Sequence, residues 1–331
     1  MSMNKRKSLP QEALLAILVL VVMVVIYIFG GGTKGFYSLQ NIMTVLRTFS
    51  YLFVAAIGMT MIIITGNIDI SFGAVISVIA VIMAAVSKLK VDIWVFLPIG
   101  MIVGMLLCGL NSLLMVKFRL PSMVITLATQ QIFYGALLLI LDGSIYNLRS
   151  NWTWFSFKFR IFEVVPGYVV IALALFVVAL IFFKYSPFVK RLYAIGNNRQ
   201  GAIYSGINVD RTLIATYMIS GALLGLSSAI LATAGNRVTC TVGNNLEMTV
   251  IACVVVGGTS ATGGSGKIYG TALGALLLAM VAPSLSHMGI NTYWTDLFTG
   301  AIIVLAVMAS ALRNYDFSAL KKRKSNVEVT K

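Results

Sequence analysis

Long apolar segments recur along almost the whole chain, and they constrain the fold more than any other feature. A helix needs roughly 20 mostly apolar residues to cross the hydrocarbon of a bilayer, at about 1.5 Å per residue. Ten candidate segments are bounded by charge, glycine or proline: residues 12–30, 48–65, 71–87, 93–116, 121–141, 167–183, 212–234, 246–256, 268–284 and 293–312. The sequence therefore predicts an all-α integral membrane protein with about ten transmembrane helices. The eighth is too short to span comfortably, so it is extended, broken or re-entrant.

The positions of lysine and arginine predict the direction of these helices, because cytoplasmic loops retain positive charge. With the N-terminus inside, 17 of the 25 basic residues fall in cytoplasmic segments. We therefore expect one transmembrane domain over residues 1–331 with both termini cytoplasmic. Its cytoplasmic parts are tails at 1–11 and 313–331 and a long loop at 184–212. No small-residue cleavage site follows the first apolar run, which predicts an uncleaved span and not a secretory signal.

Composition and residue types disfavour several other classes of protein. The net charge is +15, but the basic residues lie at helix ends, mostly on one side, so we expect membrane lipid and no nucleic acid as a partner. Cys108, Cys240 and Cys253 have no metal or redox spacing and are interpreted as packing residues. With one histidine, no nucleophile elbow and no paired carboxylates, the sequence predicts no catalytic residue and no metal site.

A glycine-rich stretch, GGTSATGGSGKIYG at residues 257–270, partly matches a phosphate-binding loop. A Walker A loop needs glycine, four residues, then Gly-Lys and a hydroxyl residue. Gly266 and Lys267 fit, but Ala261 stands in place of the first glycine and Ile268 in place of the hydroxyl residue. Because apolar runs flank the stretch, it is predicted to be a turn between membrane helices.

The segment TGNIDISFG, residues 65–73, places Asn67, Asp69 and Ser71 between two apolar runs. An ionisable residue in such a place is a candidate functional residue. Asp69 can also cap the helix that follows, by accepting backbone N–H bonds near Ser71, and the two roles are compatible. Both this segment and the glycine-rich stretch run from an apolar triplet through glycine to a small-residue helix, which suggests an internal duplication.

The predicted cytoplasmic loop at 184–212 is much longer than a helix hairpin needs, which indicates a use. Within it, QGAIYSG is typical of a short helix ended by glycine. Such a shape suits docking against a cytoplasmic partner, and a merely solvated loop is the alternative.

Together, three motifs resemble the ribose-type permeases of ATP-binding-cassette importers, over roughly residues 46–312. TGNIDISFG resembles that family's Gly-Ile-Asp-Leu-Ser motif, AIGNNRQGAIYSGINVDR its inside loop, and LEMTVIACVVVGGTSATGGSGKIYGTALGA its late glycine-rich hairpin. Asn67, LEMTVIACV and YWTD favour the autoinducer-2 branch over ribose proper.

The resemblance implies a permease subunit in a bacterial cytoplasmic membrane that is not itself an enzyme. Such a subunit pairs with a second permease, as a homodimer or a heterodimer. It receives a sugar-like substrate from an extracytoplasmic binding protein and is driven by a cytoplasmic ATPase subunit. ATP and Mg would be bound by that ATPase, so no cofactor is expected in this chain.

The resemblance also implies which residues contact the ATPase: Gly196, Gly201, Ala202, Ser205, Gly206 and Arg211. A neutral sugar needs hydroxyl partners without net charge. Candidate residues of the translocation pathway are Asn67, Asp69, Ser71, Asn111, Gln130, Gln131 and Tyr134. Polar residues in spans also join helices to one another, so a structural role is open for each.

An ion-coupled secondary transporter of a small polar solute is the main alternative. That mechanism usually places titratable residues deep within helices. We expect none of the ten acidic residues deep inside a span, because Asp69, Glu247 and Asp296 lie close to predicted ends. A passive channel would leave the long cytoplasmic loop without a use.

Overall fold

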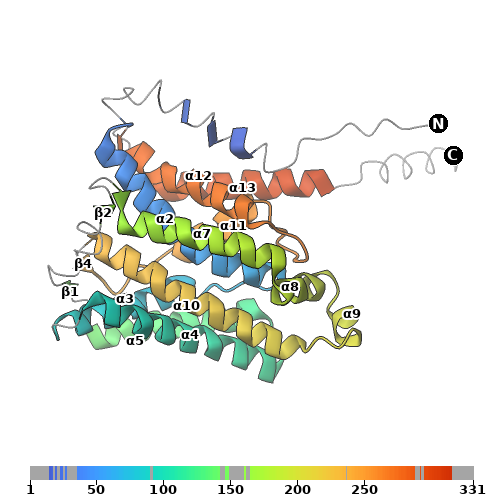
Figure 1. Cartoon of the computed structure of the whole chain (residues 1–331). Helices are drawn as coiled ribbons and strands as arrows, with labels where there is room; N and C mark the ends of the chain where they lie inside the picture. Colours follow the sequence, from blue (N-terminus) through green and yellow to red (C-terminus); the bar gives the residue numbers. More distant parts are fainter. Residues whose placement is uncertain are drawn as a thin grey trace, which may run out of the picture.

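The computed structural model describes residues 15–17, 19, 20, 23, 24, 27, 36–89, 92–141, 146–148, 160, 161, 165–235, 237–287, 291 and 294–314. Most of the predicted first span and nearly all of both predicted tails lie outside these residues. Within them, the chain forms a bundle of helices that run side by side between two ends (Figure 1). One end carries the short helices α8 (Pro187–Asn197) and α9 (Arg199–Tyr204), and we call it the α8–α9 end.

Six helices in the described part of the chain are long and apolar enough to cross a membrane. They are α2 (Leu39–Ile64), α4 (Ile93–Phe118), α5 (Ser122–Leu141), α7 (Gly167–Tyr185), α10 (Val209–Gly235) and α12 (Ile268–His287). Two apolar helices are shorter, α3 (Phe72–Ser87) and α11 (Leu246–Val256), and the last helix is α13 (Trp294–Asn314). The predicted spans therefore correspond to helices wherever the structure describes them. α2 begins nine residues before its predicted start, because no proline or glycine interrupts the chain between Ser38 and Gly58.

The predicted all-α fold class is confirmed for the described residues. These residues also include four strands of two residues each: β1 (Tyr146–Asn147), β2 (Arg160–Ile161), β3 (Val165–Pro166) and β4 (Arg237–Val238). β1 pairs antiparallel with β4, and β2 with β3, at the end opposite α8 and α9 (Figure 1). We call this the strand end. Strands of two residues are too short for alternating hydrophobicity to predict them.

Close contacts between helix backbones hold the centre of the bundle. A Cβ atom on Gly104 of α4, or on Gly221 or Gly225 of α10, would overlap backbone atoms of the facing helix. The hydroxyl of Ser220 on α10 also donates to the carbonyl of Gly58 on α2, at 2.9 Å. Small residues and hydroxyl bonds of this kind join helices in a bilayer, where lipid removes the hydrophobic drive for helices to associate.

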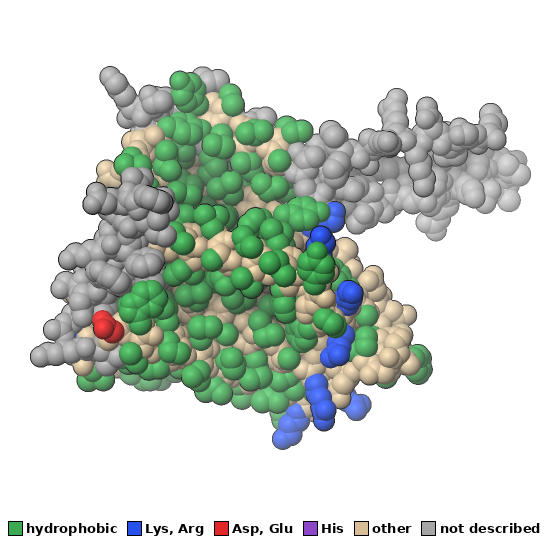
Figure 2. Space-filling model, viewed as in Figure 1, with side chains coloured by type: hydrophobic (Ala, Val, Ile, Leu, Met, Phe, Trp, Pro, Cys, Tyr) green, Lys and Arg blue, Asp and Glu red, His purple; other side chains and the backbone are tan. Residues whose placement is uncertain are grey.

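The flanks of the bundle are apolar. Large hydrophobic side chains are exposed on α4, α5 and α7, including Leu106, Leu139 and Val177 at 63%, 88% and 54%. Figure 2 shows hydrophobic side chains over the side of the molecule, and lysine and arginine gathered near the α8–α9 end. An apolar flank with charge confined to the ends is what a bilayer requires, so the fold is that of an integral membrane protein.

Candidate functional site

The chain is not helical over residues 65–71, between α2 and α3, and we call this stretch the unwound segment. Its second residue, Gly66, is in the left-handed conformation, at φ +79°. The N–H of Ile68 donates to Ser122 Oγ at 3.2 Å, and the N–H of Ile70 donates to Thr126 Oγ1 at 3.1 Å. Backbone donors away from water need such partners, so the first turns of α5 support the unwound segment.

Asp69 lies in the unwound segment and is fully buried. Its Oδ1 accepts from the N–H of Ser71 at 2.8 Å and from the hydroxyl of Ser71 at 2.6 Å. Asn111 of α4 donates from Nδ2 to Ser71 Oγ at 2.8 Å. The prediction that Asp69 accepts a backbone bond at the start of the next helix is therefore confirmed. Asp69 Oδ2 and Asn111 Oδ1 are buried and have no hydrogen-bond partner within the described residues.

A second buried carboxylate lies at the start of α11. Glu247 is 4% exposed, and its Oε1 accepts from Gln130 Nε2 of α5 at 2.8 Å. A Cβ atom on Gly73 of α3 would overlap Glu247 Oε2 and the carbonyl oxygen of Gly243, and would lie 3.0 Å from Tyr134 Oη. The hydroxyl of Ser77 accepts from the N–H of Gly243 at 2.9 Å. The first turns of α3 and α11 therefore meet beside α5.

This meeting point lies well inside the bundle. Gln130 is two turns along α5 from Ser122, roughly 12 Å at 1.5 Å per residue. α3 and α11 are therefore helices that begin in the interior, where their unpaired N–H groups favour negative charge. Asp69 and Glu247 lie close to helix ends, as predicted, so neither is inside a long span. Those ends are nevertheless buried, which the sequence did not predict.

The structure brings together five of the seven residues predicted for the pathway: Asp69, Ser71, Asn111, Gln130 and Tyr134. Gln131 is exposed on a different side of α5. The sequence reasoning missed Ser77, Ser122, Thr126 and Glu247. A signal for two of them was present, because Ser122, Thr126, Gln130 and Tyr134 follow one another at four-residue spacing in an apolar span.

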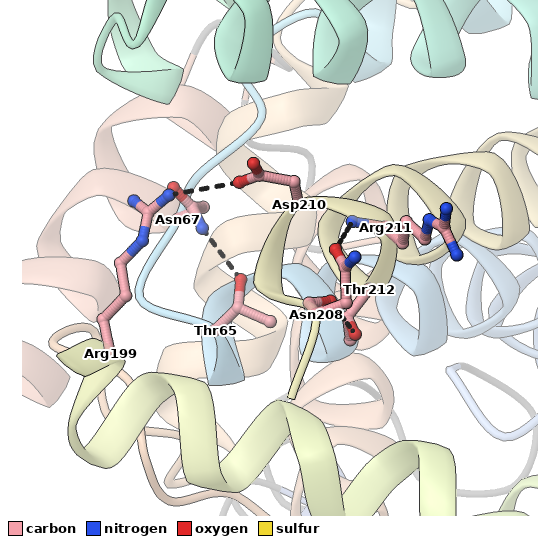
Figure 3. A network of polar contacts seen from close by, with 7 residues as sticks. All are labelled: Thr65, Asn67, Arg199, Asn208, Asp210, Arg211 and Thr212. Atoms are coloured by element: carbon pink, nitrogen blue, oxygen red, sulfur yellow. Dashed lines mark hydrogen bonds and ion pairs between the residues drawn. The ribbon is translucent and has the colours of Figure 1, made fainter. Parts of the chain in front are cut away.

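Asn67, the remaining predicted pathway residue, lies toward the α8–α9 end. It borders a cleft of about 480 Å³, whose lining includes Arg119, Ser122, Arg199 and Asp210. Asn67 donates to Thr65 Oγ1 at 2.9 Å, and the ion pair of Arg199 with Asp210 lies beside it (Figure 3). That pair spans 3.7 Å and both side chains are 61% exposed, so it adds little to stability.

The predicted loop at 184–212 is mostly helical, and this corrects its description as a loop. α8 begins after Ser186, whose hydroxyl accepts from the N–H of Phe188. α9 begins after Asn198, whose Oδ1 accepts from the N–H of Gly201 at 2.9 Å. Gly206, at φ +79°, ends α9, and the N–H of Ile207 donates to the carbonyl of Ala202 at 3.0 Å. The prediction of a short helix ended by glycine is confirmed.

The six residues predicted to contact an ATPase lie in different surroundings. Ala202 is 3% exposed and packs inward, and Gly196 packs against the end of α2. Gly201 is part-exposed, and Ser205, Gly206 and Arg211 are exposed. The sequence reasoning missed the outward side chains Ile203 and Tyr204, which are 46% and 87% exposed.

A hollow of about 550 Å³ lies beside α9, and its lining includes Phe188, Arg191, Ser205 and Arg211. We define the α9 surface as Ile203, Tyr204, Ser205, Gly206 and Arg211. This surface combines an exposed aromatic ring and an exposed aliphatic side chain with a basic hollow at one end of the bundle. Neighbouring exposed apolar side chains on one surface are typical of a protein contact.

Comparison with known proteins agrees with this architecture. Residues 41–307 match the family described as branched-chain amino acid transport system / permease component. The ribose import permease protein RbsC of Haemophilus influenzae is 30% identical, over 92% of this chain and 94% of the relative. RbsC of Bacillus subtilis is 32% identical, over 81% and 84%. The autoinducer 2 import system permease protein LsrC of Yersinia pseudotuberculosis is 30% identical, over 88% and 82%. No solved structure matches the chain.

The family match covers most of the chain and includes the unwound segment, the buried carboxylates, α8 and α9. Together with the apolar helices, it shows that the chain belongs to the family of branched-chain amino acid transport system permease components and is a multi-pass protein of the bacterial cytoplasmic membrane.

Proposed function

We propose that the chain is the membrane-spanning permease subunit of an ATP-binding-cassette importer for a monosaccharide or a related polyol-like ligand, such as a ribose-like sugar or autoinducer-2. The observation that carries this is the family match over residues 41–307, with relatives named as ribose and autoinducer 2 import permeases. The permease is not an enzyme, and a separate ATPase subunit binds ATP and Mg and supplies the energy.

The buried polar cluster around the unwound segment is proposed to contact the substrate during passage. Asp69 Oδ2, Asn111 Oδ1 and Glu247 Oε2 are acceptors without a partner in the described residues. A buried acceptor without a partner is unfavourable, and a substrate hydroxyl can supply the missing hydrogen bond. A polyol carries several such donors and no charge. A ligand of this kind therefore matches the cluster better than an anion, which two carboxylates would repel.

The exposed side of α5 is proposed to face the second permease, in a homodimer or a heterodimer. Gln131 lies about 13 Å along α5 from Ser122, at 1.5 Å per residue, and its amide is exposed. Lipid would leave that amide without hydrogen bonds, which is costly. One turn farther, a Cβ on Gly135 would meet nothing within 4 Å. A polar, open strip in an apolar helix suits a partner helix or a solvated passage.

The orientation proposed places the α8–α9 end in the cytoplasm. The apolar segments predict about ten transmembrane helices in a single domain over residues 1–331. The excess of basic residues in cytoplasmic segments predicts that both termini are inside. The α9 surface then faces the ATPase, and the strand end faces the extracytoplasmic binding protein. The unwound segment and the glycine-rich turn are proposed to descend from an internal duplication.

An ion-coupled secondary transporter is the second candidate function, and the burial of Asp69 and Glu247 favours it. Intramembrane carboxylates can exchange protons or cations. Both carboxylates, however, accept hydrogen bonds within the cluster, from Ser71 and from Gln130. The match to import permeases over most of the chain favours the ATP-driven function.

Chemical cross-linking tests the proposed ATPase contact. The three native cysteines are buried, so a thiol-reactive photo-crosslinker attached to a single introduced cysteine reports the neighbours of that position. We expect Tyr204→Cys on α9 to cross-link to the copurified ATPase subunit. Asn147→Cys, an exposed position at the strand end, is the control and should not cross-link to it. A cross-link to the ATPase from position 147, or none from position 204, would refute the proposed orientation.

A further inference from the structure

Two side chains of α8 donate hydrogen bonds to the glycine-rich turn between α11 and α12, residues 257–267. Tyr193 Oη donates to the carbonyl of Gly266 at 2.6 Å. Asn197 Nδ2 donates to the carbonyl of Gly264 at 3.2 Å and to the carbonyl of Tyr193 at 2.9 Å. The two side chains are four residues apart and so lie on one face of α8. This face is fixed to the turn at two carbonyl groups.

The glycine-rich turn is also bound to the C-terminal end of α2. The N–H of Gly264 donates to the carbonyl of Ile64 at 2.9 Å. A Cβ atom on Gly196 of α8 would overlap that carbonyl oxygen and lie 2.5 Å from the nitrogen of Gly264. α8, the turn and α2 are therefore in direct backbone contact, with no room for even one added carbon.

The same turn touches the unwound segment itself. A Cβ atom on Gly263 would lie 2.7 Å from the nitrogen of Gly66. Gly263, Gly264 and Gly66 have φ values of +88°, +75° and +79°, which residues with a side chain rarely adopt. The unwound segment begins at the residue after Ile64 and contains Asp69. A continuous set of contacts thus leads from α8 to the buried polar cluster.

We propose that Tyr193 and Asn197 are positioning residues that transmit movement of α8 to the unwound segment and so to Asp69. This rests on the proposed function, because the ATPase is what would move α8. Close-packed contacts have low compressibility, so a displacement on one side of the contact is transmitted to the other side. The unwound segment is held to α5 by the side chains of Ser122 and Thr126, so it can shift without breaking a helix.

A purely structural role for the two side chains makes a different prediction. In that case, their removal would lower stability and leave the response of the unwound segment to nucleotide intact. A transmitting role predicts that the response is lost while the complex remains assembled and hydrolyses ATP. The two roles are therefore separated by a conformational readout and not by activity alone.

The readout is the labelling rate of Asn67→Cys by a membrane-impermeant maleimide, in the complex copurified with its ATPase. Asn67 borders the cleft at the α8–α9 end, and the native cysteines are buried, so the new thiol dominates the signal. Rates are compared without nucleotide and with ATP and vanadate. With native α8, we expect ATP and vanadate to change the labelling rate at least threefold. When Tyr193→Phe and Asn197→Ala are added, we expect the labelling rate not to change.

Tyr185→Phe is the matched control, because Tyr185 is 64% exposed at the end of α7, and it should keep the full change. Tyr193→Phe alone removes one hydroxyl and replaces the double variant if that variant does not assemble. This single variant should lose at least half of the nucleotide-dependent change in labelling rate. An unaltered change in both α8 variants would overturn the inference. If the labelling rate does not respond to nucleotide even with native α8, the proposal that the ATPase moves α8 is refuted. The inference that rests on that proposal is then refuted as well.

Discussion

Replacing Gln130 by leucine tests whether the buried carboxylate of α11 depends on its partner in α5. Gln130 and Glu247 are 8% and 4% exposed, and one hydrogen bond of 2.8 Å joins them. A hydrogen bond to a charged group contributes about 2 kcal/mol, and a buried acceptor left without its donor adds the cost of desolvation. At about 2 °C per kcal/mol for a chain of this size, the hydrogen bond alone corresponds to about 4 °C, so Gln130→Leu should lower the unfolding midpoint by at least that amount.

The midpoint can be measured with a dye that fluoresces on reaction with thiols, since Cys108, Cys240 and Cys253 are buried and react only on unfolding. Met123→Leu is the control, because Met123 is 48% exposed on the same helix, and its midpoint should stay within about 1 °C of the parent. Adding Glu247→Leu to Gln130→Leu should recover at least half of the loss, because removing both partners can be nearly neutral. Equal midpoints for the two single variants, or no recovery in the double variant, would refute the reasoning.

Three further substitutions have defined outcomes. Gly73→Ala should lower the same midpoint, because the added Cβ overlaps the carboxylate of Glu247 and overpacking costs about 1–3 kcal/mol. An unchanged midpoint would contradict that close approach. Ser122→Ala with Thr126→Ala removes the two hydroxyls that accept from N–H groups of the unwound segment. Hydrogen exchange at those amides should accelerate at least tenfold. Native protection of those amides would contradict the support from α5. Gly206→Ala puts a side chain at φ +79°, which costs about 1 kcal/mol. ATPase binding should weaken roughly fivefold while the midpoint falls by no more than about 2 °C, and native affinity would argue against a role for the end of α9.

Local features of the sequence predicted the parts of the structure that depend on local chemistry. The eighth predicted span, residues 246–256, coincides with α11, because a polar stretch precedes it and glycine follows it. The bond of Asp69 to the N–H of Ser71 and the glycine that ends α9 were also predictable. Each of these features is decided within about six residues, so neighbouring residues carry enough information.

Contacts between distant segments could not be predicted in this way. Glu247 was expected near a membrane surface, because nothing local indicates that α11 begins beside Gln130, 117 residues earlier in the chain. The bond from Gly264 to Ile64 likewise joins the glycine-rich turn to a helix far away in the sequence. The outward direction of Tyr204 depends on how α9 packs against the bundle. Tertiary packing decides all three features.

The source of energy for transport tests the central claim most directly. The complete complex is reconstituted in liposomes, and uptake of ribose and autoinducer-2 is measured with ATP on the side of α8 and α9, or with a proton or sodium gradient alone. The proposed function predicts uptake of at least one of these ligands with ATP and none with a gradient. Uptake driven by a gradient in the absence of ATP would contradict the claim and would identify Asp69 and Glu247 as candidate ion-coupling residues.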